Sequence, residues 1–451
     1  MIQDKNIIAA VDIGTSKIVA MIGRKQENGK IEILGYGYEK SIGVKRGVVL
    51  NIEETVKSIK SAVQKAQQQS GIEMKDVYVG MAGQHIKSLR ASGYITRESC
   101  ENEISKEDLD KLDQSMLSIP VDVGQEIIHV LAKNYTVDRE MGIKNPIGMA
   151  GKRLEANFHI VVGEIAAAGH LKKCIDKAGL NVMKIFLEPL ASSAAVLTED
   201  EKAVGVALVD IGGGTTDIAV YSEGIIQHTA VIPFGGQCVT EDIRKGLGII
   251  EGQAEDVKLD YGYAIANDKF LQNKRVTVPG INGRPPRDFE FYHIAGIIQS
   301  RMEEIFEMVL FELEASEMKG NLGTGIVLTG GGAKLKNLAQ LAAYVTGCDI
   351  RIGSPRISVT YDKIPEIASP VYATSVGLLL CGYEDQKIRY ATQKINNQAI
   401  VENDEEKKDI DDDSNSKTIS PKRTLSSLFN RISSIKDLFY VNDYEMNQNA
   451  D

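Results

Sequence analysis

The sequence predicts an α/β protein whose two halves each begin with the same strand, Gly-rich turn and second strand. The pattern occurs at Ile7 to Ile22 (IIAAVDIGTSKIVAMI) and again at Ala207 to Tyr221 (ALVDIGGGTTDIAVY). A third Gly-rich turn follows another apolar strand, which begins at Gly325, and leads into a helix. Because the first two turns repeat one pattern far apart in the chain, we infer an internal duplication of architecture.

Each repeated turn has the residue types that bind phosphate. Glycines let the backbone N–H groups approach an anion closely, and hydroxyls add further donors. A carboxylate at the end of the preceding strand can hold a metal ion beside that phosphate, usually through water. A Gly-rich hairpin that binds no ligand would have a similar sequence, so the prediction of phosphate binding depends on the pattern occurring twice. The candidates are Asp12, Gly14, Thr15, Ser16 and Lys17 in the first turn, and Asp210, Gly212, Gly213, Gly214, Thr215 and Thr216 in the second.

The third turn has a strand before it and a helix after it, an arrangement that suits an anion or a nucleotide. Its residues are Gly330, Gly331, Gly332, Ala333 and Lys334. Three such turns in one chain make a nucleotide cleft the leading hypothesis.

Composition narrows the function classes. A chain of 451 residues can build several domains, and a net charge of −10 argues against a general nucleic-acid binder. The five cysteines lie far apart without a CxxC motif, which disfavours a zinc site or a disulfide framework. The N-terminus does not resemble a signal peptide, and no apolar run reaches the ~18 to 20 residues of a spanning helix. We therefore expect any membrane contact to be made from the surface.

The first half reads as strands at 31–38, 44–49 and 77–81 with a helix at 52–68, which fits a mixed sheet. Between 83 and 162 the pattern changes to short strands and one helix after Ser105, where Asp108 completes a capping box. We interpret this region as an inserted subdomain.

Glu188 begins a helix of small residues that we expect to cross between the halves. A second helix of small residues, at 371–380, is expected to cross in the same way. The carboxylate could orient a water for phosphoryl transfer, or it could be an ordinary exposed carboxylate at a helix start. Further on, Glu255 and Lys258 share a helical face. They form either a surface ion pair or a contact to a ribose hydroxyl.

Residues 386–421 are polar and acidic, which predicts a disordered linker. A helix at 422–440 follows, with one apolar face and several cations, and a polar tail at 441–451. This pattern is typical of an interfacial membrane anchor, although a helix that docks on a protein groove would look similar. The membrane-facing candidates are Leu425, Leu428, Phe429, Arg431, Ile432, Ile435, Lys436 and Phe439.

Together these features resemble the FtsA family of actin-like bacterial cell-division proteins. Besides the Gly-rich turns, the matching segments are HVLAKNYTVDREMGIKNPIGMAGKRLE, LEPLASS, FGGQCVTEDI and AEDVK. The turns alone would specify only the wider actin, Hsp70 and sugar-kinase superfamily. The first of these segments, at 129–155, and the basic terminal helix are far more specific.

The resemblance implies a two-lobed actin-like ATPase fold that holds ATP and Mg²⁺ between the lobes. The turns would grip the phosphates, Asp12 and Asp210 would face the metal, Glu188 would lie near the attacking water, Glu255 and Lys258 would contact the ribose, and Gly330 to Lys334 would contact the adenosine. The implied subdomains are 1A (1–82 and 163–197), an inserted 1C (83–162), 2A (198–230 and 302–385) and 2B (231–301).

Family members form protofilaments, bind anionic lipids of the inner membrane and bind the C-terminal peptide of the tubulin-like ring protein FtsZ. They help to recruit later division proteins at the cytoplasmic face of the membrane, at the division site. Arg301 falls where the family often has an arginine in the FtsZ contact, but Ser300 replaces a common proline before it.

We therefore expect a mainly structural, polymerising adaptor with at most slow ATPase activity. The alternative is a small-molecule kinase of the same superfamily. An Hsp70-like chaperone is disfavoured because no substrate-binding β-domain follows residue 385.

Overall fold

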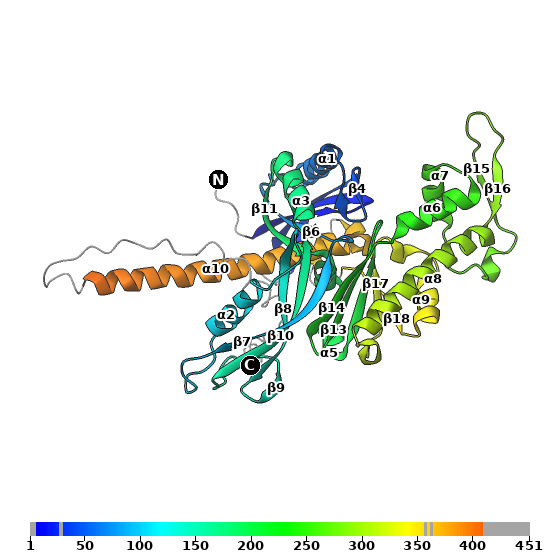
Figure 1. Ribbon diagram of the computed structural model, residues 1–451. Helices are drawn as coiled ribbons and strands as arrows, with labels where there is room; N and C mark the ends of the chain where they lie inside the picture. Colours follow the sequence, from blue (N-terminus) through cyan, green and yellow to red (C-terminus); the bar gives the residue numbers. More distant parts are fainter. Residues whose placement is uncertain (1–5, 27–29, 356–358, 361–363, 409–451) are drawn as a thin grey trace, which may run out of the picture.

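The computed structural model describes residues 6–26, 30–355, 359–360 and 364–408. In Figure 1 the first lobe lies at the top, the second lobe extends to the right, and a smaller inserted domain lies below. One long helix, α10 (Ala373–Lys408), runs from between the lobes out of the body to the left.

The two lobes contain sheets of the same topology. Their strand orders are β3-β2-β1-β6-β11, with β19 outside β3, and β14-β13-β12-β17-β18. In each, the first three strands are antiparallel and the next two are parallel to the central strand. The duplication predicted from the turns is therefore present in the sheets. The strands are β1 (Ile7–Ile13), β2 (Lys17–Lys25), β3 (Ile31–Lys40), β6 (Asp76–Met81), β11 (Asn181–Leu187), β12 (Val206–Ile211), β13 (Thr216–Ser222), β14 (Ile225–Ile232), β17 (Ile326–Thr329), β18 (Ile350–Ile352) and β19 (Val359–Thr360).

Two helices cross between the sheets, as the small-residue segments predict. Helix α4 (Glu188–Val196) packs against α10, and their apolar residues share one core with residues of both sheets. The backbones approach so closely that a Cβ on Gly377 would overlap the carbonyl oxygen of Ala191. Only glycine fits there, so this crossing fixes where α10 begins relative to both lobes.

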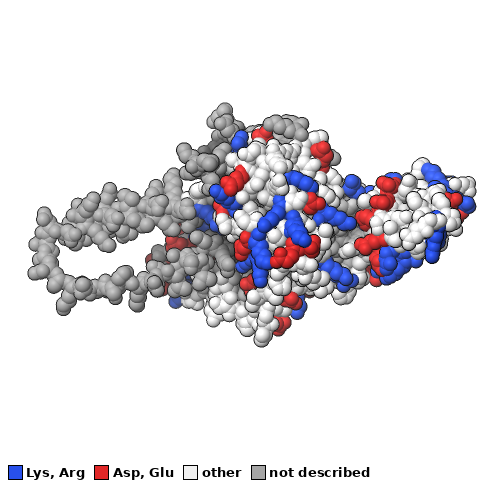
Figure 2. Space-filling model, turned by 90° about the horizontal axis from the view of Figure 1, so that it is seen from above, with Lys and Arg blue, Asp and Glu red and all other residues white. Residues whose placement is uncertain are grey.

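The remaining elements cover the outer faces and form the outer part of the second lobe. Helices α1 and α3 pack on the first sheet, whereas α8 and α9 pack on the second. Their bounds, with those of the small elements, are β4 (Val44–Lys45), β5 (Val48–Val49), α1 (Ile52–Ser70), α3 (Ile165–Ala178), α5 (Glu199–Val204), α6 (Gly236–Leu247), α7 (Glu251–Tyr261), β15 (Arg275–Val278), β16 (Arg287–Glu290), α8 (Phe291–Ala315) and α9 (Leu338–Thr346). Seen from above in Figure 2, basic and acidic side chains intermingle on this face of the molecule.

The inserted domain is a four-stranded antiparallel sheet with one helix on it. Its strand order is β7-β10-β8-β9, and its core is separate from those of the lobes. The helix has the predicted capping box, in which Ser105 and Asp108 bond each other's backbone N–H at 3.2 and 3.3 Å. The elements are β7 (Lys87–Thr96), α2 (Lys106–Met116), β8 (Gln125–Val137), β9 (Glu140–Ile143) and β10 (Arg153–Glu164).

The predicted disorder of residues 386–421 is wrong for its first part, because α10 continues to Lys408. The segment from Tyr383 to Lys408 lacks glycine and proline and is rich in good helix formers. The start of the extension is also fixed to the first lobe, since Asp385 is fully buried and accepts a bond of 2.8 Å from Lys184. The low hydrophobicity of residues 386–408 therefore did not predict their helical structure.

The rest of the predicted linker (409–421), the helix at 422–440 with all its candidate membrane residues, and the tail at 441–451 lie outside the described residues. Among the residues that the structure describes, no helix has the length and apolar character needed to cross a membrane.

Candidate functional site

A hollow of about 480 Å³ lies between the lobes, and both repeated turns line it. The third turn and the first residue of α4 also reach it. The structure thus brings together most of the predicted site residues, from segments up to 322 positions apart (12 to 334). They are Asp12, Gly14, Thr15, Ser16, Lys17, Glu188, Asp210, Gly212, Gly213, Gly214, Thr215, Glu255, Lys258, Gly330, Gly331, Gly332 and Lys334.

The two repeated turns have the same internal geometry and meet face to face. Each is closed by one backbone bond, from Gly14 to the Lys17 carbonyl at 3.0 Å and from Gly212 to the Thr215 carbonyl at 2.9 Å. Across the hollow, a Cβ on Gly213 would overlap the Ser16 hydroxyl. The glycines therefore let the two turns approach, and they leave backbone N–H groups open to a ligand.

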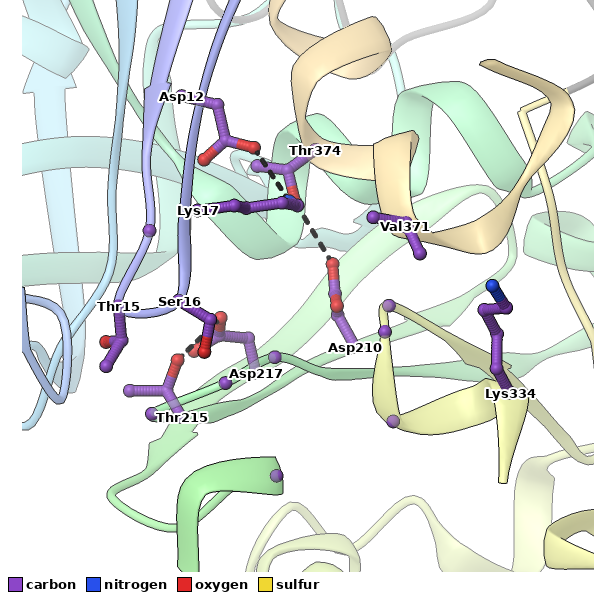
Figure 3. A pocket seen from close by; sticks show the side chains of 18 of the residues that line it. Asp12, Thr15, Ser16, Lys17, Asp210, Thr215, Asp217, Lys334, Val371 and Thr374 are labelled. Atoms are coloured by element: carbon purple, nitrogen blue, oxygen red, sulfur yellow. Dashed lines mark hydrogen bonds and ion pairs between the residues drawn. The ribbon is translucent and has the colours of Figure 1, made fainter. Parts of the chain in front are cut away.

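The two strand-end aspartates are buried and held by hydroxyls from the crossing helices. Asp12 accepts a bond of 2.7 Å from Ser375, and Asp210 accepts bonds of 3.2 Å from Thr374 and 2.7 Å from Ser192. Figure 3 shows Asp12 and Asp210 approaching from opposite sides of the hollow. Adjacent residues of α10 thus bind one aspartate in each lobe.

Lys17 is the cation nearest to these carboxylates, with its Nζ 3.3 Å from Asp12 Oδ2. Burial opposes its charge, but the carboxylates of Asp12 and Asp210 outweigh this and raise the pKa of Lys17. The ammonium group therefore stays protonated and holds positive charge at the bottom of the hollow.

Two further carboxylates crowd the same space. Glu188 is partly buried, and desolvation together with the neighbouring carboxylates raises its pKa well above the ordinary value. Asp217, which accepts a bond of 3.3 Å from Thr215, has its pKa raised by the same causes, burial first and then Asp210. For Asp210, burial raises the pKa despite the bond from Ser192. A cation brought into the hollow would relieve this repulsion.

Sequence reasoning missed Asp217, and the symmetry of the turns explains why. The position that corresponds to it in the first turn, 198 residues earlier, is Val19, which is buried in the core. A charged residue two positions beyond Thr215 at the start of an otherwise apolar strand was the available signal. Ser192, Thr374 and Ser375 were missed as ligands of the aspartates because they read as small packing residues.

No group of three or more His, Cys, Asp or Glu side chains among the described residues is arranged to hold a metal ion alone. Mg²⁺ in proteins is usually held by one or two carboxylates, with water and substrate phosphate completing its shell. The crowded carboxylates beside phosphate-type turns fit that mode of binding.

The far end of the hollow has a compact polar network on α6 and α7. Lys258 donates to Glu255 and Thr240, both at 2.8 Å, and to the Gly236 carbonyl at 3.1 Å. Glu255 also accepts from the Thr240 hydroxyl. Glu255 and Lys258 therefore form the predicted ion pair and also line the hollow, and the contact to a ribose hydroxyl stays a prediction.

Thr216 and Ala333, which were predicted to bind nucleotide, do not reach the hollow, and Arg301, which was predicted for the FtsZ contact, lies elsewhere. Thr216 begins β13 on the opposite side from Thr215, and its buried hydroxyl donates to the Phe234 carbonyl at 2.9 Å. Strand alternation explains this difference. Ala333 is fully buried in the core of the second lobe. Arg301 on α8 is paired with Asp242 at 2.6 Å and with Glu304, away from the hollow.

The fold and site define a class, the two-lobed actin-like proteins. The structure is similar to PilM in the PilM–PilN type IV pilus biogenesis complex, with a TM-score of 0.60 and 15% identity over 83% of this chain and 98% of that one. It is also similar to MreB5 of Spiroplasma citri bound to ADP, with a TM-score of 0.51 and 15% identity over 87% and 98% of the two chains.

Sequence comparison then shows the family. The chain is 39% identical to the cell division protein FtsA of Pseudomonas aeruginosa, over 85% of this chain and 91% of that protein. It is 35% identical to FtsA of Escherichia coli K12, over 84% and 91%. Residues 207–377 match the family described as cell division protein FtsA, and residues 83–162 match the SHS2 domain inserted in FtsA. The chain belongs to the FtsA family of cell division proteins, which confirms the resemblance.

Proposed function

We propose that this chain binds ATP with Mg²⁺ between its lobes and acts as a polymerising adaptor that tethers the FtsZ ring to the cytoplasmic face of the membrane at the division site. The glycine turns would donate backbone N–H groups to the phosphates, Lys17 would balance their charge, and Glu188 would orient a water. Bound Mg²⁺ would supply further positive charge beside Asp12 and Asp210. The polymer would also help to recruit later division proteins.

The observation that carries the proposal is the pair of hydroxyls at the start of α10. Ser375 binds Asp12 and Thr374 binds Asp210, so one helix contacts the acidic end of both turns. The same helix leads toward the C-terminal segment that carries the predicted membrane helix. A ligand that draws the turns together would therefore act on the element joined to the proposed anchor.

The kinase alternative gains no support from the lining of the hollow. Among the described lining residues there is no histidine, and the carboxylates lie at the phosphate turns, at the start of α4 (Glu188) or in the Lys258 network. A kinase needs a base beside an acceptor pocket.

The nucleotide part is tested with Asp210→Asn and, as a matched control, Asp200→Asn on the exposed surface of α5. We expect Mg²⁺-dependent ATP binding, measured by calorimetry, to be lost in the first variant and kept in the second. Equal ATP affinity in both variants would remove Asp210 from the site.

The adaptor part is tested by co-sedimentation with anionic liposomes and an FtsZ C-terminal peptide, with and without ATP. Phe429→Glu with Ile432→Glu should release the protein, because both lie on the apolar face of the predicted helix. Ser427→Glu with Ser434→Glu makes the same charge change on the polar face and should keep more binding. Equal pelleting of both double variants and the parent would refute the anchor.

The FtsZ contact is tested with Arg301→Ala. Because this arginine is already paired with Asp242 and Glu304, Asp242→Ala is the companion variant. Loss of peptide pelleting in the arginine variant alone would support a direct contact. Equal loss in both variants would indicate that the ion pair only maintains the shape of this surface.

A further inference from the structure

A second hollow, of about 480 Å³, lies where the inserted domain meets the second lobe. Its lining residues lie on β7, β8, β10 and β14, the edge strand of the second sheet, and Figure 1 shows β14 beside the strands of the inserted domain. It shares no lining residue with the hollow between the turns. Its polar lining residues are Arg90, Ser92, Lys133, Asn134, Asn157 and Gln227.

Lys133 projects from an irregularity in the inserted sheet. Asn157 pairs with Asn134, and the next residue, Phe158, pairs with Ala132, so Lys133 is an extra residue without a cross-strand partner. Such β-bulges re-aim a side chain and often lie beside functional sites. This bulge places a lysine in the wall of a hollow.

The Lys133 ammonium group makes no hydrogen bond or ion pair within 4 Å of any residue that the structure describes. It is half-buried, and burial followed by the nearby Arg90 lowers its pKa, whereas the carboxylate of Glu317, which is paired with Arg90, offsets only part of this. A partly desolvated cation without a close counter-ion is unfavourable, and an anion at this point would compensate it.

The other polar groups of the hollow fit a ligand with one negative charge. Arg90 is already engaged, because it pairs with Glu317 at 3.1 Å and donates to the Ala315 carbonyl at 3.1 Å. No carboxylate is among the described lining residues. Lys133 is therefore the one cation of this lining that lacks a close partner, which matches a carboxylate better than a phosphate with two charges.

The side-chain amides indicate what carries the carboxylate. Asn157 donates to Asn134 at 2.8 Å, which leaves the Asn134 NH₂ as a donor, and Gln227 offers both a donor and an acceptor. Groups that donate and accept suit the alternating N–H and C=O groups of a peptide backbone. The open form of the hollow also suits a chain segment.

We propose that this hollow binds an acidic peptide segment, with Lys133 pairing with a Glu or Asp carboxylate and the amide side chains contacting the peptide backbone. Because Gln227 belongs to the second lobe and Lys133 to the inserted domain, the bound segment bridges the two. It adds to existing contacts between them, such as the bond of 2.6 Å from Ser88 to the Thr229 carbonyl.

The first test measures the reactivity of Lys133 toward acetic anhydride by mass spectrometry, in the full chain, with hexaglutamate or inorganic phosphate added. The exposed Lys152 of the same domain is the internal control. We expect hexaglutamate to protect Lys133 saturably and to leave Lys152 unchanged. Equal protection of both lysines would show only general charge screening, and saturable protection by phosphate as strong as by the peptide would overturn the peptide assignment.

The second test measures binding of fluorescent hexaglutamate by anisotropy. Lys133→Gln should weaken it roughly tenfold, the effect of losing one charged hydrogen bond, whereas Lys152→Gln should not. Gln227→Ala should also weaken binding, because the proposed segment contacts both domains. Binding unchanged in Lys133→Gln, or weakened equally in Lys152→Gln, would overturn the proposal.

Discussion

The two phosphate-type turns share one backbone and differ in their side chains. Both have a strand-end aspartate and the same closing hydrogen bond. The first turn ends in Lys17, and the matching position of the second is Thr215; the second has Asp217 where the first has Val19. Duplication therefore supplied a symmetric frame, and divergence placed the cation in one lobe and the extra carboxylate in the other.

Removing the Lys17 cation should have the largest effect on stability among the changes that test this difference between the turns. Lys17→Met leaves the buried Asp12 carboxylate without its ion-pair partner, so we expect the unliganded protein to lose roughly 3 kcal/mol of stability. Thr215→Val changes the matching position and should cost about 1 kcal/mol, the value of one hydrogen bond. Chemical denaturation measures both, and equal losses would contradict the asymmetry.

Among the contacts of the inserted domain, one buried histidine faces each lobe. His129 accepts a bond of 3.0 Å from the Leu187 N–H in the first lobe, whereas His159 bonds the Thr229 hydroxyl at 2.8 Å in the second. Burial lowers the pKa of each to about 3. The unfolded chain takes up protons below about pH 6.5 while the folded protein does not, so stability falls as pH drops from about 6.5 toward 3.

We expect a loss of roughly 2 kcal/mol per histidine at pH 5. His159→Gln should make the unfolding free energy less dependent on pH, whereas His170→Gln at an exposed position should not. Thermal unfolding between pH 5 and 8 checks this. A parallel pH profile for His159→Gln and the parent would show that His159 is not the cause.

A smaller effect is expected where the turns meet. Gly213→Ala adds a Cβ that overlaps the Ser16 hydroxyl and would lie 2.8 Å from the Ser16 Cβ, so the two turns must move apart, and we expect a loss of about 1 kcal/mol and weaker ATP binding. Gly212→Ala is the matched change, because its Cβ would lie 3.2 Å from the nearest atom, the Thr215 carbonyl oxygen. If Gly212→Ala proved the worse of the two, contact between the turns would not be the limiting feature.

The smallest change is expected from Glu188→Gln. Because the folded protein raises the pKa of Glu188, its ionisation destabilises the unliganded fold as pH rises above about 4.5. The variant should therefore have a slightly higher melting temperature than the parent at pH 8 and show less gain from added Mg²⁺ and ATP. A lower melting temperature at pH 8 would contradict the assigned direction.

Local signals in the sequence predicted most of the fold and much of the site. Strand periodicity, the glycine turns and the Ser105 capping box depend on neighbouring residues, and the structure has them where expected. What was missed depends on contacts between distant segments. Ser375 reaches Asp12 across 363 positions, and no local pattern marks it as a ligand.

The extent of helix α10 was also predicted wrongly, and the reason is again a contact between residues far apart in the chain. Its polar composition predicted disorder from residue 386, whereas Asp385, held by Lys184 and by the Tyr78 hydroxyl at 3.1 Å, fixes the helix to the first lobe just before that point. Helix propensity then continues the element to Lys408.

The length of α10 converts small rotations into large displacements. A helix of 36 residues is about 54 Å long, nearly twice the hydrocarbon thickness of a bilayer. Because Asp385 fixes the helix to the first lobe, a rotation of that lobe by about 10° about the turn where Thr374 and Ser375 bind the two aspartates would carry α10 with it and move its far end by roughly 9 Å. The displacement of Lys408 would therefore be large even for a small rotation centred on Asp12 and Asp210.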